Sequence, residues 1–159
     1  MRNRLSLTLL FVSLLFCAPA QTAEWSQFLG PLGNGVSQET KLPAQWSTTK
    51  GILWTTPLEG QSNSSPAVTS KRIDLTTQKK DKSLWVISID RKTGKLLRET
   101  RVGSGSLAAK GPGNLYVHRH NAATPSPIAD EDHIWAFFGT GLLVCLEAKS
   151  GQTVWQRDL

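Results

Sequence analysis

LWVISIDRKTGK, residues 84–95, is the stretch that decides the fold, because it occurs twice in the chain. It aligns without gaps on GLLVCLEAKSGQ, residues 141–152, at an offset of 57 residues. In each copy an apolar run ends at an acidic residue, and a hydroxyl residue and a glycine follow three and four positions later. Repetition at a fixed spacing indicates a repeat architecture.

The second half of each copy predicts a hairpin turn. Such a loop needs one residue at positive φ, and Gly94 and Gly151 adopt that conformation without steric cost. Asp90 and Glu147 are placed to accept backbone N–H groups where the chain reverses.

The first half of each copy predicts a strand that is apolar on both faces. In the first copy Trp85, Ile87 and Ile89 alternate with Leu84 and Val86. In the second copy Leu142, Val144 and Leu146 share one face of the predicted strand, and Leu143 and Cys145 share the other. A strand with one wet face would alternate with polar residues, so the pattern predicts sheets stacked between other sheets.

The similarity extends beyond the turn and defines a four-stranded unit. Upstream, Ser65-Pro66 and Ile73 align on Ser126-Pro127 and Ile134 at an offset of 61, so the first copy carries four extra residues in the loop at 78–82. Downstream, a large residue followed four positions later by an aliphatic one occurs three times, at 54–58, 98–102 and 155–159. No convincing helical period follows residue 20. We therefore expect an all-β fold, a partial β-propeller of about two four-stranded blades with an N-terminal lead-in.

The turn chemistry resembles a known family. The pattern Ala-x-Asp-x-x-Thr-Gly-Lys-x-x-Trp marks the propeller repeats of pyrroloquinoline-quinone (PQQ) dehydrogenases and of non-enzymatic relatives, among them a lipoprotein scaffold of bacterial outer-membrane assembly. Residues 88–98 and 145–155 are similar to it. The repeat positions are Asp90, Thr93, Gly94, Lys95, Glu147, Ser150, Gly151 and Trp155. The copies depart from the pattern with Ser88 and Arg98 in the first, and with Cys145, Glu147, Ser150 and Gln152 in the second.

The resemblance implies a structural role for the tryptophan at the end of the pattern, which ties one blade to the next. Trp155 inherits that role, whereas Arg98 leaves the first tie open. Residues 25–47 are similar to the lead-in of exported members. We expect a signal peptide at 1–20, a lead-in at 21–51 and an incomplete propeller repeat region at 52–159. Family rings use seven or eight blades, so the expectation is a truncated frame or fragment, or alternatively a two-blade protein that assembles with copies of itself.

The N-terminus predicts export. Arg2 and Arg4 precede an apolar run at 5–16, and Ala18-Pro19-Ala20 supplies the small residues of a cleavage site after Ala20. The alternatives are a retained anchor, which would need a longer run, and a lipoprotein, for which Phe16 before Cys17 is unsuitable. Localisation in the periplasm or cell envelope follows, with no transmembrane span in the mature chain.

The mature composition limits the partners. Cys145 would be the only remaining cysteine, so no internal disulfide can form, and it is interpreted as a small buried hydrophobe. Sixteen basic and twelve acidic residues remain, and only Lys79, Lys80 and Lys82 cluster. A solvated loop explains that cluster, and no nucleic-acid partner is expected.

No motif predicts a catalytic or metal site. Gly103-Ser104-Gly105 lacks the βαβ context of a dinucleotide loop and is assigned to a connection that runs to about Asn121. His118 and His120 lack a third zinc ligand nearby, and residues 130–133 (Asp-Glu-Asp-His) lack the glycine and closing glutamate of a calcium loop. Asn63-Ser64-Ser65 matches a glycosylation sequon, which is relevant only to a eukaryotic source. Ser64 and Ser65 do not form a nucleophile elbow, because no Gly-x-Ser-x-Gly frames them.

Three functions follow as hypotheses. The first is a non-catalytic exported propeller protein that binds other proteins or further blades, without a cofactor. The second is the N-terminal piece of a PQQ-dependent dehydrogenase, which would use PQQ and calcium. The third is a carbohydrate- or polymer-binding propeller, with Trp25, Trp46 and Tyr116 as lining residues.

Overall fold

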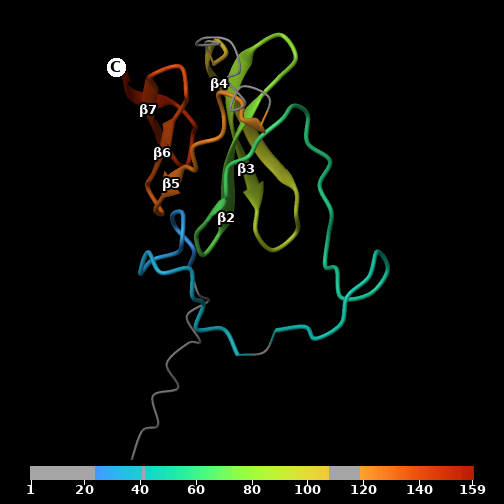
Figure 1. The fold of residues 1–159 in the computed structure, drawn as a ribbon. Helices are drawn as coiled ribbons and strands as arrows, with labels where there is room; N and C mark the ends of the chain where they lie inside the picture. The colour runs from blue at the N-terminus through green and yellow to red at the C-terminus, as the bar shows by residue number, and fades with distance from the viewer. Residues whose placement is uncertain (1–23, 41, 108–118) are drawn as a thin grey trace, which may run out of the picture.

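The computed structural model describes residues 24–40, 42–107 and 119–159 and has two four-stranded antiparallel sheets. The first sheet has the order β1-β2-β3-β4, and the second has the order β5-β6-β7-β8 (Figure 1). The strands are β1 (Ala67–Val68), β2 (Arg72–Gln78), β3 (Ser83–Asp90), β4 (Leu96–Ser104), β5 (Ile128–Ala129), β6 (His133–Phe137), β7 (Leu142–Glu147) and β8 (Thr153–Asp158). The expected all-β fold, a partial propeller of two blades, is confirmed.

The two sheets pack face to face, and the core lies between them. Figure 1 shows the second sheet, in orange and red, beside the first in green and yellow. Leu84 and Val86 of β3 and Ile134 and Val144 of the second sheet are at most 2% exposed. The full cluster is Ala67, Leu84, Val86, Val102, Ala122, Ala123, Ala129, Ile134, Ala136, Phe138, Leu142, Val144, Leu146 and Ala148. Burial of this apolar surface is the main force that holds the sheets together.

The opposite face of the first sheet is also apolar and is partly covered by the lead-in. Ile87 and Ile89 on that face are 0% and 3% exposed. Gln61 forms an antiparallel bridge with Gln78, and the hydroxyl of Thr77 donates to the carbonyls of Glu59 and Gln61. In Figure 1 the lead-in, in teal, lies on the side of the first sheet away from the second. The first sheet is thus flanked on both sides.

Each sheet contains a bulge at the same repeat position. Ser88 pairs with Arg98 but Ile89 pairs with Leu96, and Cys145 pairs with Trp155 but Leu146 pairs with Thr153. One residue of each last strand is therefore left without a partner. The bulge sets which face of the sheet the Arg98 and Trp155 side chains occupy.

The structure differs from the sequence-based expectations at residues 103–104 and 54–58. Gly103 and Ser104 belong to β4 and not to the connection, and a Cβ at Gly103 would lie 2.8 Å from the Leu142 side chain. Residues 54–58 form no strand, although they repeat the pattern of β4 and β8. The predicted signal peptide, His118 and Tyr116 lie outside the described residues. Within the described ranges, no helix is long and apolar enough to cross a membrane.

Candidate functional site

The repeated turn after β3 is held by one carboxylate. Asp90 Oδ1 accepts hydrogen bonds from the Thr93 backbone N–H at 2.7 Å and from the Thr93 hydroxyl at 2.6 Å. The Gly94 N–H donates to the Asp90 carbonyl at 2.9 Å, and Gly94 has φ 71°. The Asp90 N–H donates to the Lys95 carbonyl at 2.8 Å. The hydrogen bonds from Thr93, its hydroxyl first, hold the pKa of Asp90 below its usual 3.8.

The turn after β7 repeats these contacts. The Ser150 hydroxyl donates to the Glu147 carboxylate, and the Gly151 N–H donates to the Glu147 carbonyl at 2.7 Å. Gly151 has φ 74°, and the Glu147 N–H donates to the Gln152 carbonyl at 2.8 Å. An aspartate with threonine and a glutamate with serine therefore build the same loop.

Trp54 ties the lead-in to the first turn. Its indole Nε1 donates to the Arg91 carbonyl at 3.2 Å, and a Cβ added at Gly94 would overlap its ring. Two residues on, the Thr56 hydroxyl donates to the Gly94 carbonyl at 2.5 Å. The turn glycine therefore makes room for an aromatic ring from the preceding element.

Arg98 makes the equivalent tie between the two sheets. Its guanidinium donates to the carbonyl of Lys149 at 2.7 Å and to that of Ala148, and a Cβ at Gly151 would overlap its side chain. Ala148 is the repeat equivalent of Arg91, so Arg98 and Trp54 bind equivalent backbone carbonyls of the two turns. The tie that the sequence left open is present, made by a cation instead of an indole.

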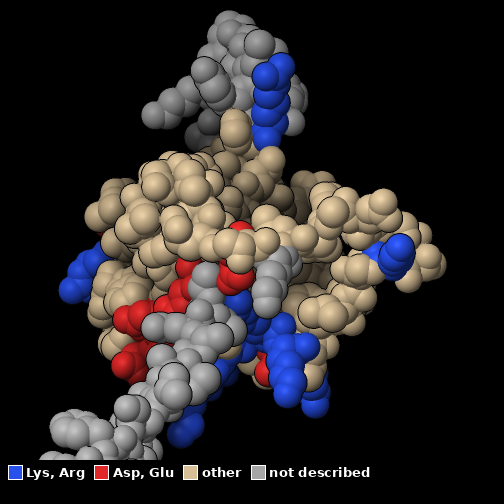
Figure 2. Space-filling model, turned by 90° about the horizontal axis from the view of Figure 1, so that it is seen from below, with Lys and Arg blue, Asp and Glu red and all other residues tan. Residues whose placement is uncertain are grey.

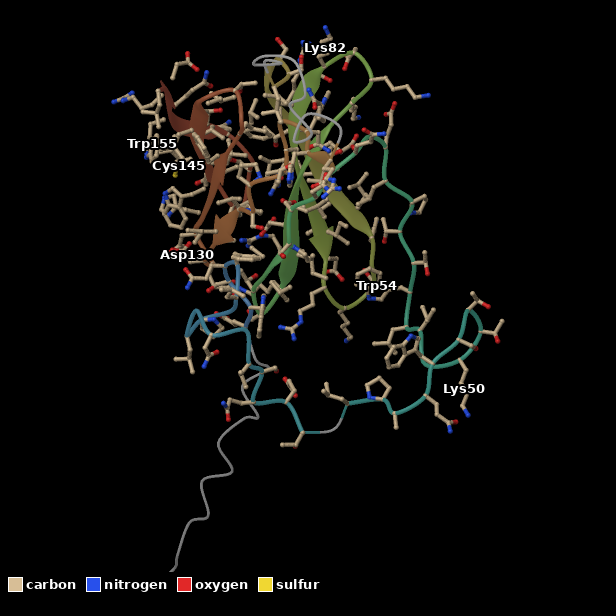
Figure 3. All side chains as sticks on the ribbon, viewed as in Figure 1. Lys50, Trp54, Lys82, Asp130, Cys145 and Trp155 are labelled. Atoms are coloured by element: carbon tan, nitrogen blue, oxygen red, sulfur yellow. The ribbon has the colours of Figure 1, made fainter. Side chains whose placement is uncertain are left out.

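Trp155 is the third residue of this series, and it lies on a face that no other part of the described chain covers. Residues in register across the second sheet share a face, which brings together Ile128, Trp135, Cys145 and Trp155. The next row on this face pairs Phe137 with Leu143 and Leu143 with Arg157. We call this set the outer face. Figure 3 shows Trp155 and Cys145 on the side of the second sheet away from the first, opposite Trp54.

The outer face is apolar and partly open to solvent. Ile128 and Phe137 are 47% and 39% exposed, and Trp135, Leu143 and Trp155 are half-buried. Beyond the end of β8, Leu159 is 83% exposed. Cys145 lies between the two tryptophans in register and is buried, so desolvation, followed by the nearby Asp130 carboxylate, raises the pKa of its thiol. The thiol is therefore a packing group on this face.

The corresponding face of the first sheet is polar at its centre. Asp74 is fully buried, and its Oδ1 accepts a hydrogen bond from the Ser88 hydroxyl at 2.6 Å. Arg72 Nε lies 3.4 Å from Asp74 Oδ2 without hydrogen-bond geometry, while its other nitrogens donate to the Asp130 and Glu131 carbonyls of the second sheet. Burial raises the pKa of Asp74 despite the hydrogen bond from Ser88 and the charge of Arg72. The second sheet has Trp135 and Cys145 where the first has Asp74 and Ser88, which is why the centre of its outer face is apolar.

Residues 130–133 form a turn and an inter-sheet clamp. Asp130 Oδ1 accepts the N–H groups of Asp132 and His133, and Glu131 accepts hydrogen bonds from Ser70 and pairs with Lys71 at 3.4 Å. Seen from this end of the molecule, acidic and basic side chains lie next to one another (Figure 2). Across the described ranges, no three His, Cys, Asp or Glu side chains are placed so that they could hold one metal ion.

The remaining candidates do not converge on one site. Trp25 pairs through its backbone with Val68, and its ring lies where a Cβ on Gly30 would be. Trp46 is 71% exposed in the lead-in arm, and Tyr116 lies outside the described residues. Asn63 contacts Asn121 and the Arg119 carbonyl, and His120 is exposed.

Sequence reasoning missed the roles of Trp54, Arg98 and the Arg72–Asp74 pair. The repeat itself was the available signal for the first two, because Trp54, Arg98 and Trp155 occupy equivalent positions in it. Nothing in the local sequence marks Asp74 as buried, since its burial depends on the second sheet.

Comparison with known proteins gives one result at the family level. The PQQ_2 family, described as outer membrane protein assembly factor BamB, matches residues 36–159. No curated protein matches the chain.

Proposed function

The chain belongs to the PQQ_2 family of repeat proteins, and from that membership we propose that it is an exported, non-catalytic protein that binds other proteins or further repeat units. One observation carries the proposal. The outer face presents Trp135, Trp155, Phe137 and Ile128 to solvent, whereas the equivalent face of the first sheet is packed against a neighbouring sheet. An exposed apolar patch rimmed by polar groups is typical of an interaction surface.

The two ties inside the chain indicate what Trp155 recognises. Trp54 and Arg98 each lie on a glycine turn that opens with an acidic residue, and each donates to a turn carbonyl. Both turns of the described chain are occupied in this way. We therefore expect Trp155 to lie against a glycine turn of a partner, with its indole N–H on a backbone carbonyl.

Export and an envelope location are part of the proposal. The support is the basic, apolar and small-residue order of residues 1–20 and the name of the matched family. N-terminal sequencing of the protein isolated from the periplasm is expected to start at Gln21. A chain that keeps Met1, or that is found in the cytosol, would contradict this part.

Photo-crosslinking tests the interaction surface. A photoreactive residue replaces Phe137, and a second version carries it at Trp46, which is equally aromatic, more exposed, and outside the outer face. The proposal requires a crosslinked protein from position 137 and not from position 46. That protein, identified by mass spectrometry and purified, should bind the chain directly and bind Trp155→Ala at least tenfold more weakly.

The same preparation tests the non-catalytic part. Addition of PQQ, calcium, alcohol or sugar substrates and an electron-accepting dye should give no dye reduction. Dye reduction would make the protein a dehydrogenase and overturn this part. Equal crosslinking from both positions, or binding that survives Trp155→Ala, would instead reject the outer face as the interaction surface.

A further inference from the structure

The hairpin between β2 and β3 is longer than the repeat requires. Its four extra residues lengthen the strands, since β2 and β3 have seven and eight residues where β6 and β7 have five and six. The turns at 79–82 and 138–141 have four residues each, so the extra loop residues expected from the sequence are strand residues in the structure. Three of its residues are lysines, at 79, 80 and 82, and the equivalent turn at 138–141 has none. The longer strands therefore carry a lysine-rich turn at one end of the first sheet, where Figure 3 labels Lys82.

The hairpin borders a cavity of about 480 Å³. Its lining consists of Glu59, Gly60, Gln61, Gln78, Lys79, Lys80, Lys82 and Ser106. These residues come from the lead-in, the hairpin and the segment after β4, so the cavity exists only in the folded chain. Its volume lies within the range of small-molecule sites.

Lys79 has its charge compensated within the fold. Its Nζ lies 3.2 Å from Glu59 Oε2, 3.4 Å from Glu99 Oε2 and 4.2 Å from the centre of the Trp85 ring. Desolvation alone would lower the pKa of Lys79, but the contacts with Glu59 and Glu99 outweigh it and raise that pKa. Lys79 thus serves as a positioned part of the cavity wall.

Lys80 and Lys82 have no such compensation. Both line the cavity, and neither has a carboxylate partner among the described residues. Among the described lining residues there are three ammonium groups and one carboxylate, a formal charge of +2.

The backbone of the hairpin holds Lys82 in one conformation. Lys82 has φ 65°, which is unfavourable for a side chain with a Cβ. Its N–H donates to the Lys79 carbonyl, its own carbonyl accepts from Gly105 at 2.9 Å, and Asp81 Oδ1 accepts from the Ser83 N–H. A lysine kept at a position suited to glycine, by bonds on both sides, indicates a use for its side chain.

We propose that this cavity binds the phosphate group of a small phosphorylated sugar, with Lys80 and Lys82 as the charged contacts. A phosphomonoester carries about −1.5 to −2 charges at pH 7, which matches the wall. Gln61 and Ser106 add uncharged polar groups for the hydroxyls of the sugar. The site lies at the end of the first sheet, away from the outer face, so it stands independently of the proposed protein interaction.

Calorimetric titration of the full chain with glucose 6-phosphate tests the site, with glucose as the uncharged control. We expect binding of the ester that weakens as salt rises, and none of glucose. Lys80→Gln with Lys82→Gln should weaken binding at least tenfold. The matched control, Lys92→Gln with Lys149→Gln, makes the same charge change at exposed positions in the two glycine turns and should stay within twofold.

Lys82→Gly guards against a folding artefact, because glycine suits the positive φ while removing the ammonium, and it should also weaken binding. Co-sedimentation with phosphatidylcholine vesicles that contain a phosphorylated glucosamine lipid distinguishes a lipid head group from a free sugar phosphate, and either source supports the site. Equal binding of glucose and its phosphate, no binding of the ester, or an equal loss in the control pair overturns the proposal.

Discussion

Arg98 occupies on the Gly151 turn the position that Trp54 occupies on the Gly94 turn. Both donate to the carbonyl one residue after the acidic residue, that of Ala148 or Arg91, and both fill the space above the glycine. The indole does this with one N–H, whereas the guanidinium reaches two carbonyls in succession. A planar cation with several donors can therefore replace an aromatic ring at this joint.

Loss of the Arg98 tie should destabilise the sheet pair. Arg98→Ala removes charge-assisted hydrogen bonds to two backbone carbonyls, so we expect the free energy of unfolding to fall by about 1–3 kcal/mol. Arg98→Trp should recover most of this. Arg101→Ala, at an exposed residue of the same strand, is the control and should change stability by about 0.5 kcal/mol or less. Urea unfolding measures all three, and an equal loss at Arg98 and Arg101 would contradict the tie.

Gly94 should tolerate replacement by alanine less well than Gly33 does. Gly94→Ala combines a positive φ with overlap against the Trp54 ring, and we expect a loss of about 2–5 kcal/mol. Gly33 has φ 64° but nothing within 4 Å of an added Cβ, so Gly33→Ala isolates the backbone cost of about 1–2 kcal/mol. Thermal unfolding monitored by circular dichroism compares them. Equal effects would show that the ring contact contributes nothing.

Asp74 should make the protein less stable as pH rises. Burial raises the pKa of Asp74 above its usual 3.8, so the folded state holds this proton more tightly than the unfolded state. The contribution is complete below about pH 3.8 and is lost as pH rises through the folded-state pKa. The stability of the wild type minus that of Asp74→Asn, from urea unfolding at several pH values, should therefore decrease with rising pH. A difference that grows with pH would refute the raised pKa.

Asp90 should act with the opposite sign. The hydrogen bonds from Thr93 lower its pKa, so its contribution is present above about pH 3.8 and is lost as pH falls through the folded-state pKa. The advantage of the wild type over Asp90→Asn should shrink on acidification. Thr93→Val removes the hydroxyl donor and should move the loss to higher pH. An advantage that is independent of pH would argue against this carboxylate as the anchor of the turn.

Lys82→Gly should stabilise the protein slightly or leave it unchanged. Glycine relieves the cost of φ 65° but adds freedom to the unfolded chain, and the net effect is about 1 kcal/mol at most. Lys80→Gly is the matched comparison, because Lys80 is exposed in the same turn and has no positive φ. This variant should lower the free energy of unfolding. Chemical denaturation of both variants decides the point. A clear loss at Lys82 would show that its side chain contributes to folding and not to binding alone.

The fold was accessible from the sequence because its determinants are local and repeated. The apolar runs before Asp90 and Glu147 and the glycines after them recur at one offset, and the structure has a strand and a turn at each place. The prediction of an all-β partial propeller and the family resemblance are confirmed. The structural roles of the repeat residues stay predictions that the variants above address.

Features that depend on distant segments were not accessible. Residues 54–58 carry the pattern of a closing strand, yet no neighbouring strand pairs with them within the described residues. The segment therefore keeps the side-chain contact of Trp54 with the turn but forms no strand hydrogen bonds. The residue types around the bulges opposite Ser88 and Cys145 give no signal from which the bulges could be predicted. The cavity beside Lys80 and Lys82 requires residues 59–61 and 106, which lie far apart in the chain. Such features come from packing and not from propensity.

The joint has a direction, since a side chain that precedes a sheet in the chain, Trp54 or Arg98, meets the glycine in the last turn of the sheet that follows, Gly94 or Gly151. The donor and acceptor surfaces are therefore different, and Trp54 and Arg98 already fill both acidic-glycine turns of the described chain. A second copy would have to release one of these two side chains to receive Trp155, whereas a unit with an empty turn would extend the row of sheets without any rearrangement.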